Sequence, residues 1–309
     1  MKKLILSVLL IPAVFSAQQN VSRDAEIANY VSQVSADSLK SHINKLVSFG
    51  TRHTMSSTTD AKKGIGAARN WVLSKFKNYA KNTDGRMEVF LQSQTIQPDG
   101  KRINQPTDLG NAIAILRGTD PNDKRIFMIG GHLDSRVSDV MNAKDFAPGA
   151  NDDGSGVGAV IESARILSQS KFPATIVFVA FSGEEQGLLG AKMLAEKAKN
   201  ENWQLEALLN NDMVGNNLSS ETNLINANQL RVFSEGLPQF DLDKEAQGIR
   251  NLGLENDGEA RQLARYIKEI GERYVDNLEV KLIYRNDRFL RGGDHTSFVN
   301  QGFSAVRLT

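Results

Sequence analysis

Three short motifs in the middle of the chain carry side chains that can bind a metal ion and activate water. They are Gly-Gly-His-Leu-Asp at 130–134, Gly-Ala-Asn-Asp-Asp-Gly-Ser-Gly at 149–156 and Ser-Gly-Glu-Glu-Gln-Gly at 182–187. A hydrolytic metal site needs a few fixed nitrogen or oxygen ligands and an open position where water is bound. Cysteine is absent, so the ligands must be histidines and carboxylates. The candidate ligands are His132, Asp152, Glu185 and, further along the chain, Asp212.

The Glu184-Glu185 pair adds a candidate general base. Adjacent carboxylates leaving a strand point in different directions, so one can bind metal while the other, unbound, faces the coordinated water. A solvated charge pair in a turn is the ordinary explanation for two adjacent glutamates. Here an apolar run precedes the pair and Ser182-Gly183 permits a tight exit from it. These neighbours favour the catalytic interpretation.

Asp134 lies two residues after His132. In an extended chain the two side chains lie on the same side. The Asp134 carboxylate is then placed to accept the second imidazole N–H and to fix the histidine tautomer, a support that metal-binding histidines commonly require.

The glycine-rich segment 149–156 also suggests a phosphate-binding loop, because it precedes a predicted helix. Asp152 and Asp153 would repel a phosphate, and no lysine follows as it does in a P-loop. The acidic residues therefore favour a cation.

Apolar runs of strand length precede these residues. Arg125 to Ile129 leads into the first motif, Ala174 to Phe181 into the third, and Leu205 to Asn210 into Asp212. Val157 to Gln169 has apolar residues at helical spacing. Alternating strands and helices predict an α/β fold, in which ligand sites form beyond the carboxyl ends of the strands. We expect the candidate residues to converge on one such edge.

The rest of the chain supplies further predicted elements. Apolar periodicity predicts helices over Ser35 to Phe49, Ala61 to Tyr79, Gly187 to Lys199, Glu259 to Val275 and Asp294 to Asn300. It predicts strands over Leu278 to Tyr284 and Ser304 to Leu308. It also predicts an edge hairpin formed by the strands Met87 to Gln94 and Asn111 to Leu116. Residues 216–256 show no clean period and are expected to form a long irregular segment that walls the pocket.

The first residues have the pattern of a secretory signal peptide. Lys2 and Lys3 precede an apolar run that reaches small residues at Ser16-Ala17. We assign 1–17 to the signal peptide, 18–35 to an N-terminal arm and 36–309 to one domain, and we expect a secreted or periplasmic protein with no membrane span after cleavage. Removing 1–17 takes away two lysines and no acid, which changes the net charge from +1 to −1. Nothing in that charge indicates a nucleic-acid or anionic-membrane partner, and we expect none. The oligomeric state is not indicated.

From about Leu39 to Thr309 the chain resembles metallopeptidase family 28, the co-catalytic zinc aminopeptidases related to bacterial leucyl aminopeptidase and to glutaminyl cyclases. The motifs quoted above match in order and at similar spacing. The resemblance implies a single α/β domain of zinc-peptidase architecture, with a central mixed β-sheet flanked by helices, and two Zn²⁺ ions per chain. It implies that His132 and Asp212 hold one zinc, Asp152 bridges, Glu185 holds the second and Glu184 is the general base. It also implies a cis peptide bond between Asp152 and Asp153.

One departure from the family pattern concerns the second zinc. In the family, a histidine from a segment nearer the C-terminus completes the ligands of the second zinc. His295 matches an earlier histidine of the family, one that is not a metal ligand. His295 is therefore only a weak substitute. With Asp152 and Glu185 alone, the second zinc has two protein ligands where catalytic zinc normally has three. Because an apolar strand also ends the sequence, we expect it to be part of a longer protein, truncated at its C-terminus.

The resemblance implies an aminopeptidase that acts on peptides with a free N-terminus, and the signal-peptide pattern predicts that it is secreted. A glutaminyl-peptide cyclotransferase on the same fold is one alternative, and a binding domain without catalysis is another, because fold alone does not establish activity. Retention of Glu184 beside the candidate ligands argues against the binding domain, since a receptor needs no general base.

Overall fold

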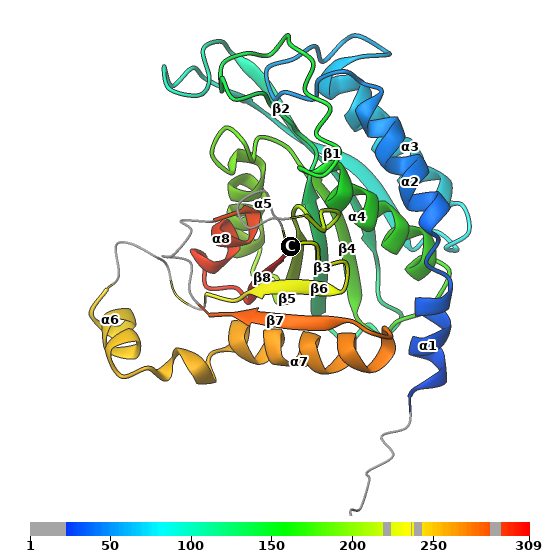
Figure 1. Ribbon diagram of the computed structural model, residues 1–309, viewed down its shortest axis with the longest axis vertical. Coiled ribbons are helices and arrows are strands. Elements are labelled where there is room, and N and C mark those ends of the chain that lie inside the picture. The colour runs from blue at the N-terminus through cyan, green and yellow to red at the C-terminus, as the bar shows by residue number, and fades with distance from the viewer. Residues whose placement is uncertain (1–22, 219–223, 236, 238–242, 285–291) are drawn as a thin grey trace, which may run out of the picture.

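The structure of the chain is a computed structural model that describes residues 23–218, 224–235, 237, 243–284 and 292–309. The predicted signal peptide lies outside these residues, as does the first part of the predicted arm. The described end of the arm forms helix α1, Ala25–Ser32 (Figure 1). Its first turn is capped by Asp24, whose side chain accepts the backbone N–H groups of Glu26 and Ile27.

A single mixed sheet of eight strands organises the described chain, in the order β1-β2-β4-β3-β5-β8-β6-β7. The strands are β1 Met87–Ile96, β2 Thr107–Leu116, β3 Arg125–His132, β4 Thr175–Phe181, β5 Gln204–Asn211, β6 Gln229–Phe233, β7 Glu279–Ile283 and β8 Ala305–Leu308. Strands β4, β3, β5 and β8 run parallel to one another. On either side of these four, β2 pairs antiparallel with β4 and β6 pairs antiparallel with β8. Strands β1 and β2 pair antiparallel at one edge. The predicted mixed sheet and edge hairpin are confirmed.

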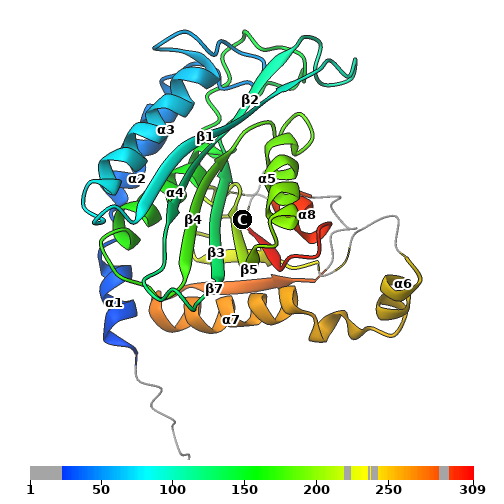
Figure 2. The ribbon, with the colours of Figure 1, turned by 180° about the vertical axis from the view of Figure 1, so that it is seen from behind.

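Helices cover both faces of the central strands (Figures 1 and 2). Helices α2 Ala36–Val47, α3 Gly64–Ala80 and α4 Gly154–Leu167 pack on one face, and α5 Leu189–Asn200 and α8 Asp294–Val299 pack on the other. Alternate residues of β4 point to opposite faces, so Phe178 joins the first core and Val179 the second. This double coverage explains why the strand sequences are nearly continuous apolar runs rather than alternating ones.

Helix α7, Glu259–Tyr274, forms a third small core under the last strands. Its Ala264 packs with Val232 of β6, Val280 of β7 and Val306 of β8. Strand β8 therefore lies inside the sheet between β5 and β6, as its apolar sequence predicts. No helix in the described part of the chain is long and apolar enough to cross a bilayer.

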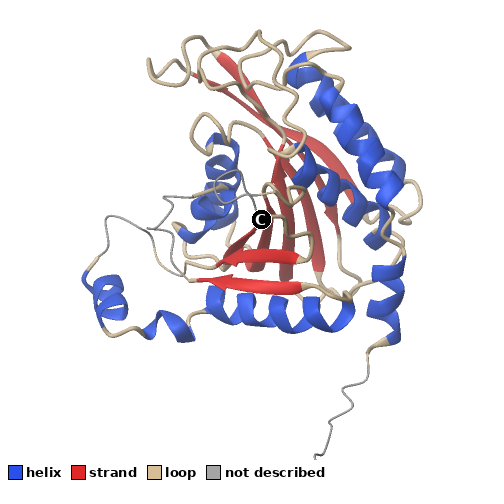
Figure 3. Cartoon of the chain, viewed as in Figure 1, coloured by secondary structure: helices blue, strands red, loops and turns tan. Residues whose placement is uncertain are grey.

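The prediction that 216–256 is irregular is wrong in part. The described residues of this range include strand β6, helix α6 at Lys244–Asn251 and a short 3-10 helix at Leu254–Asp257. Only five residues long, β6 pairs with β7 and β8, which lie some fifty and seventy residues further along the chain. Its structure therefore depends on partners that a local pattern does not reveal. Helix α6 buries no residue and projects from the body of the domain (Figure 3). Its eight residues are too few to show a sustained helical period in the sequence.

The helices around the first motifs follow their predictions with small shifts at the ends. Ser35 caps α2 by accepting the N–H of Ser38. Helix α3 begins at Gly64, three residues later than predicted, because the Asp60 side chain accepts the N–H groups of Lys62 and Lys63 in a turn that precedes the helix.

Candidate metal centre

The carboxyl ends of three neighbouring parallel strands deliver the candidate residues to one edge of the sheet. His132 is the last residue of β3, Glu184 and Glu185 follow β4, and Asp212 follows β5. Asp152 lies in the turn just before α4. The expected convergence at one edge is therefore present in the structure.

His132, Asp152 and Asp212 form a compact group of possible metal ligands. One ligand atom of each lies within 4.8 Å of the other two, and the Nε2 atom of His132 is 3.0 Å from Oδ1 of Asp152. His132 and Asp212 are buried, whereas Asp152 is partly accessible. Imidazole nitrogen and carboxylate oxygen are donors that zinc binds in proteins, and three such ligands leave an open position for water. These residues therefore fit a catalytic zinc ion.

The electrostatics of the group also favour a cation. Burial by itself lowers the pKa of His132, but hydrogen bonding to Asp134 and Asp152 outweighs it and the pKa lies well above its usual value. The negative carboxylates that stabilise the protonated His132 would also stabilise a metal cation bound at the same place. The Oδ1 atom of Asp212 also accepts a hydrogen bond from Nη2 of Arg307 at 2.9 Å, which fixes that carboxylate.

Asp134 contacts the His132 imidazole through both its main chain and its side chain. The Nδ1 atom of His132 is 3.1 Å from the backbone carbonyl oxygen of Asp134 and 3.7 Å from the carboxylate oxygen Oδ1 of the same residue. The carboxylate also accepts three backbone N–H groups, from Gly183, Glu184 and Glu185. Its predicted support of the imidazole stays a prediction, and the structure adds a second task, which is to hold the turn that carries the two glutamates.

Asp153 links three parts of the site, a role that its sequence position before a predicted helix does not indicate. Its Oδ2 atom accepts the N–H of His132 at 2.9 Å, and its Oδ1 atom accepts the N–H groups of Gly156 at 2.9 Å and Met213 at 3.1 Å. These segments adjoin the three residues of the compact group, His132, Asp152 and Asp212. The Asp152–Asp153 peptide bond is cis, as the family resemblance implies. The Asp-Asp pair in the sequence was the available signal, but only the fold shows which loops the second aspartate joins.

Glu184 lies in the environment that a general base requires. Burial raises its pKa to about 7, and the nearby carboxylates of Asp212, Asp134 and Glu185 act in the same direction, whereas His132 opposes them. A carboxylate with a pKa close to neutrality is able both to accept and to return a proton.

Glu185 points to a different neighbour, as predicted for adjacent glutamates. Its Oε2 atom accepts a hydrogen bond from Nε of Arg136 at 2.6 Å, and its backbone carbonyl accepts one from Arg102, also at 2.6 Å. It is not part of the three-ligand group. Within the described residues, Asp152 and Glu185 are the side chains that the family resemblance assigns to a second ion, and their role there stays a prediction.

His295 has a carboxylate partner of its own. Its Nε2 atom lies 2.6 Å from Oε1 of Glu235, and both residues are buried. The preceding residue, Asp294, is fully buried and its carboxylate has no hydrogen-bond partner among the described residues. Burial raises the pKa of Asp294 well above its usual range, and the charge of Glu184 adds to this effect. Asp294 is not among the predicted site residues, because no local sequence pattern shows that it lies near the site.

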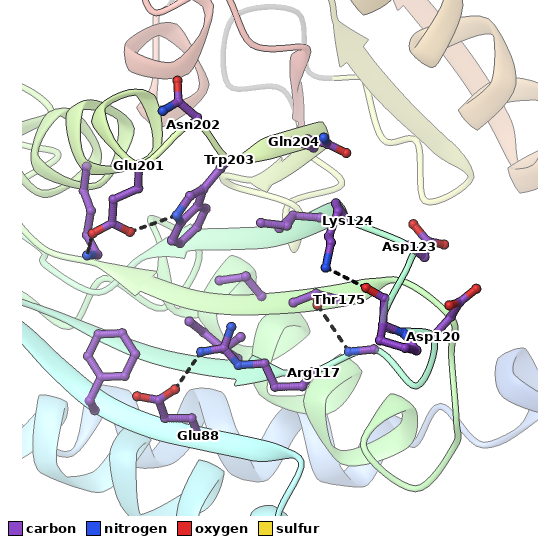
Figure 4. Close-up of a pocket in the computed structure, with 17 residues that line it drawn as sticks. Glu88, Arg117, Asp120, Asp123, Lys124, Thr175, Glu201, Asn202, Trp203 and Gln204 are labelled. Carbon is purple, nitrogen blue, oxygen red and sulfur yellow. Dashed lines mark hydrogen bonds and ion pairs between the residues drawn. The ribbon is translucent and has the colours of Figure 1, made fainter.

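A groove of about 580 Å³ lies at the opposite end of the strands (Figure 4). Residues at the starts of β3, β4 and β5 line it, namely Ile126, Thr175 and Gln204. Two ion pairs lie in its lining, one of Arg117 with Glu88 at 3.0 Å and one of Lys197 with Glu201. The candidate ligands lie beyond the other ends of the same strands, so this groove is separate from the metal centre.

Comparison with known proteins places this geometry in context. Residues 111–309 match the profile of peptidase family M28. A probable zinc metalloprotease from Leptosphaeria maculans is 42% identical over 286 residues, which are 93% of this chain and 66% of the relative. Another from Pyricularia oryzae is 42% identical over 288 residues, which are 93% of this chain and 57% of the relative. The chain therefore spans less than two thirds of the length of these curated relatives.

Solved structures share the fold at low sequence identity. The Legionella pneumophila LapA aminopeptidase has a TM-score of 0.66 and 19% identity, with 100% of this chain and 69% of that chain covered. The Porphyromonas gingivalis glutaminyl cyclase has a TM-score of 0.57 and 21% identity, with 88% of this chain and 83% of that chain covered. These likenesses concern the fold, which hosts two different reactions.

Proposed function

Because the chain belongs to peptidase family M28, we propose that it is a zinc-dependent aminopeptidase that removes residues from the free N-terminus of peptides. The observation that carries this proposal is the group formed by His132, Asp152 and Asp212 at the carboxyl ends of the strands, with Glu184 beside it. The curated relatives from Leptosphaeria and Pyricularia are described as probable zinc metalloproteases, and LapA, which shares the fold, is an aminopeptidase.

Each residue of the site has a separate task in this proposal. His132, Asp152 and Asp212 would hold the ion, which when bound would act as a Lewis acid that acidifies water and polarises the scissile carbonyl. Glu184 takes a proton from the attacking water and later gives it to the leaving amine, so that water adds to the carbonyl carbon as the carbon–nitrogen bond breaks. The Asp134 carboxylate keeps Glu184 in reach by holding its backbone N–H.

A second zinc ion is part of the proposal. Asp152 would bridge the two ions and Glu185 would bind the second, with Arg136 orienting the Glu185 carboxylate through its 2.6 Å hydrogen bond. Elemental analysis of the full-length protein should then find about two zinc ions per chain. A content of one ion, unchanged in Glu185→Gln, would show that the second position is not used.

The test of the peptidase proposal uses a panel of chromogenic aminoacyl substrates with and without a strong chelator. Hydrolysis that stops in chelator and returns when zinc is added supports it. Because the side-chain preference is not readable from the sequence, the panel must include apolar, acidic and basic residues. Activity that persists in chelator, in a sample shown to be free of zinc, would contradict it.

A glutaminyl-peptide cyclotransferase is the second candidate function, favoured by the likeness in fold to glutaminyl cyclases. Incubation with a peptide that begins with glutamine separates the two, because a cyclase releases ammonia and forms a pyroglutamyl peptide, whereas an aminopeptidase releases free glutamine. Formation of the pyroglutamyl product without hydrolysis of any aminoacyl substrate would replace the first proposal.

We also propose that the protein is exported, on the evidence of the pattern in residues 1–17. Sequencing the N-terminus of the mature protein should find that it begins at Gln18. A mature protein that begins at Met1 and stays in the cytosol would contradict this proposal.

A further inference from the structure

Arg52 is a fully buried arginine at the base of the metal centre. It lies in the Gly50-Thr-Arg-His-Thr54 segment between α2 and α3, and only 1% of its surface is exposed. In the sequence this segment is only a turn between two helices. In the structure its arginine reaches the two loops that carry the candidate ligands.

The guanidinium group of Arg52 donates hydrogen bonds to four backbone carbonyl groups. Its Nε atom binds the carbonyl of Leu133 at 2.7 Å, Nη1 binds those of Leu46 at 3.2 Å and Pro148 at 2.7 Å, and Nη2 binds that of Gly149 at 2.9 Å. Three segments distant in sequence are thereby joined. The rigid planar fork of arginine suits such a set of acceptors, whereas lysine offers three donors on one atom.

Two of these carbonyls belong to the loops of the metal centre. Leu133 directly follows His132, and Gly149 opens the loop that contains Asp152. The Gly149 carbonyl also accepts the N–H of Gly154 at 2.9 Å, so that the loop is closed around Asp152. An added Cβ at Gly149 would lie 2.8 Å from Nη2 of Arg52, which shows how closely the guanidinium is seated against this loop.

The main chain and a serine extend the same junction. The N–H of Arg52 donates to Oγ of Ser135 at 3.2 Å, and that hydroxyl donates to the carbonyl of Ala147 at 2.7 Å. In the described part of the chain, no salt bridge joins Arg52 to a carboxylate. Its charge is instead surrounded at longer range by Asp153, Asp134 and Asp152, which partly offset the effect of burial on the Arg52 pKa.

We propose that Arg52 is a positioning residue of the metal centre, which fixes the backbones after His132 and before Asp152 so that both ligands are held in place before a metal arrives. The inference that this affects zinc rests on the proposed function, but the fixing of the two loops does not. Removing the fork should loosen the loops in the metal-free protein, and it should weaken zinc binding in the full-length protein.

The test compares Arg52→Lys with Arg69→Lys in the full-length protein. Arg69 is also a buried arginine, but it binds the carbonyl of Asp108 at the edge hairpin and is the matched control. The first measurement is hydrogen–deuterium exchange of the metal-free proteins. Arg52→Lys should exchange faster than wild type in 132–135 and 149–156, whereas Arg69→Lys should not. Unchanged exchange in both loops would overturn the proposal.

The second measurement is zinc affinity in a competition titration with a chromogenic chelator, made well below the melting temperature of each variant. Arg52→Lys should bind zinc about 10–100-fold more weakly than wild type, and Arg69→Lys should match wild type. A purely structural role would lower the melting temperature of both variants and leave the zinc affinity of the folded protein unchanged. If wild type binds no zinc but the exchange difference is present, the proposed function fails and the role of Arg52 in fixing the loops stands.

A milder pair of variants covers the case in which Arg52→Lys does not fold. Ser135→Ala removes the hydroxyl that makes two hydrogen bonds of the same junction, with the N–H of Arg52 and the carbonyl of Ala147, and it keeps the buried charge. Its control is Ser168→Ala, a buried serine at the far end of α4. Ser135→Ala should weaken zinc binding about tenfold, the effect of two hydrogen bonds, and should speed exchange in 149–156. Behaviour identical to Ser168→Ala in both measurements would overturn the proposal.

Discussion

The carboxylate of Asp134 accepts the backbone N–H of Gly183 at 2.9 Å, and in this way the first motif holds the third. The same carboxylate accepts the N–H groups of Glu184 at 3.2 Å and Glu185 at 3.1 Å, as well as the hydroxyl of Thr54 at 3.2 Å. A buried carboxylate with several N–H donors is strongly stabilised as the anion. The negative charge of Asp134 therefore fixes the turn that carries both glutamates.

Replacing Asp134 with asparagine should destabilise the protein. The amide keeps one acceptor oxygen but turns an NH₂ group toward backbone N–H donors. We expect a loss of about 1–3 kcal/mol in the free energy of unfolding, measured by urea denaturation of the metal-free protein. Asp276→Asn is the control, because Asp276 is exposed and its salt bridge with Arg23 contributes little. Equal stabilities of the two variants would contradict this role of Asp134.

Separating the base from the ligands requires two variants. Glu184→Gln should keep its zinc and lower kcat by roughly 10²–10⁴-fold, since it removes only the proton carrier. Asp152→Asn should instead lose zinc, since it removes a charged ligand from the group formed with His132. Zinc content by elemental analysis and kcat on an aminoacyl substrate are measured on the same samples. Full activity in Glu184→Gln would show that the base is assigned wrongly.

Two glycines in helices give opposite predictions for stability. A Cβ at Gly156 would lie 2.3 Å from the backbone oxygen of Asn211 and 2.4 Å from the Asp153 carboxylate. Gly156→Ala should therefore cost about 1–3 kcal/mol. At Gly248 in α6 a Cβ meets no described atom within 4 Å, so Gly248→Ala should stabilise by about 0.5–1 kcal/mol. Thermal denaturation measures both, and a stabilising Gly156→Ala would contradict the close packing of the two loops.

His42, which is not a residue of the metal centre, should make the stability of the protein depend on pH. It is buried against Trp71 with neither ring nitrogen hydrogen-bonded among the described residues. Burial lowers its pKa below the usual value, Lys75 acts in the same direction and Glu162 opposes them. The folded protein therefore binds this proton more weakly than the unfolded chain. The stability contributed by neutral His42 is complete above the unfolded-state pKa of about 6.5 and is lost as the pH falls through the folded value.

The corresponding variant is His42→Gln. Its free energy of unfolding should fall less than that of wild type between about pH 7.5 and pH 5, because glutamine does not bind a proton in this range. Urea denaturation at the two pH values gives the difference for each protein. An equal or larger fall in the variant would mean that His42 is protonated without cost in the folded state.

The sequence predicted those parts of the molecule in which local pattern and structure agree. The apolar runs before His132, Glu184 and Asp212 became the parallel strands β3, β4 and β5, because strands buried on both faces need such runs. The convergence of these residues followed from the rule that sites form at the carboxyl ends of the strands.

Other parts depend on contacts that no local pattern encodes. Arg52 binds residues 81 and 97 positions away, and Asp153 joins loops 21 and 60 positions away. Strand β6 exists because β7 and β8 pair with it. The sequence places the side chain of Asp134 near the imidazole because the two residues are close along the chain. Only the fold shows that the same carboxylate also accepts the backbone N–H groups of 183–185.

The central claim is that His132, Asp152 and Asp212 hold a zinc ion. Anomalous X-ray diffraction at the zinc absorption edge, from crystals of the full-length protein grown with zinc, tests it most directly. The account predicts a strong peak about 2.0–2.2 Å from Nε2 of His132 and from one carboxylate oxygen each of Asp152 and Asp212. A map without a peak among these three side chains, in crystals that contain zinc elsewhere, would contradict it.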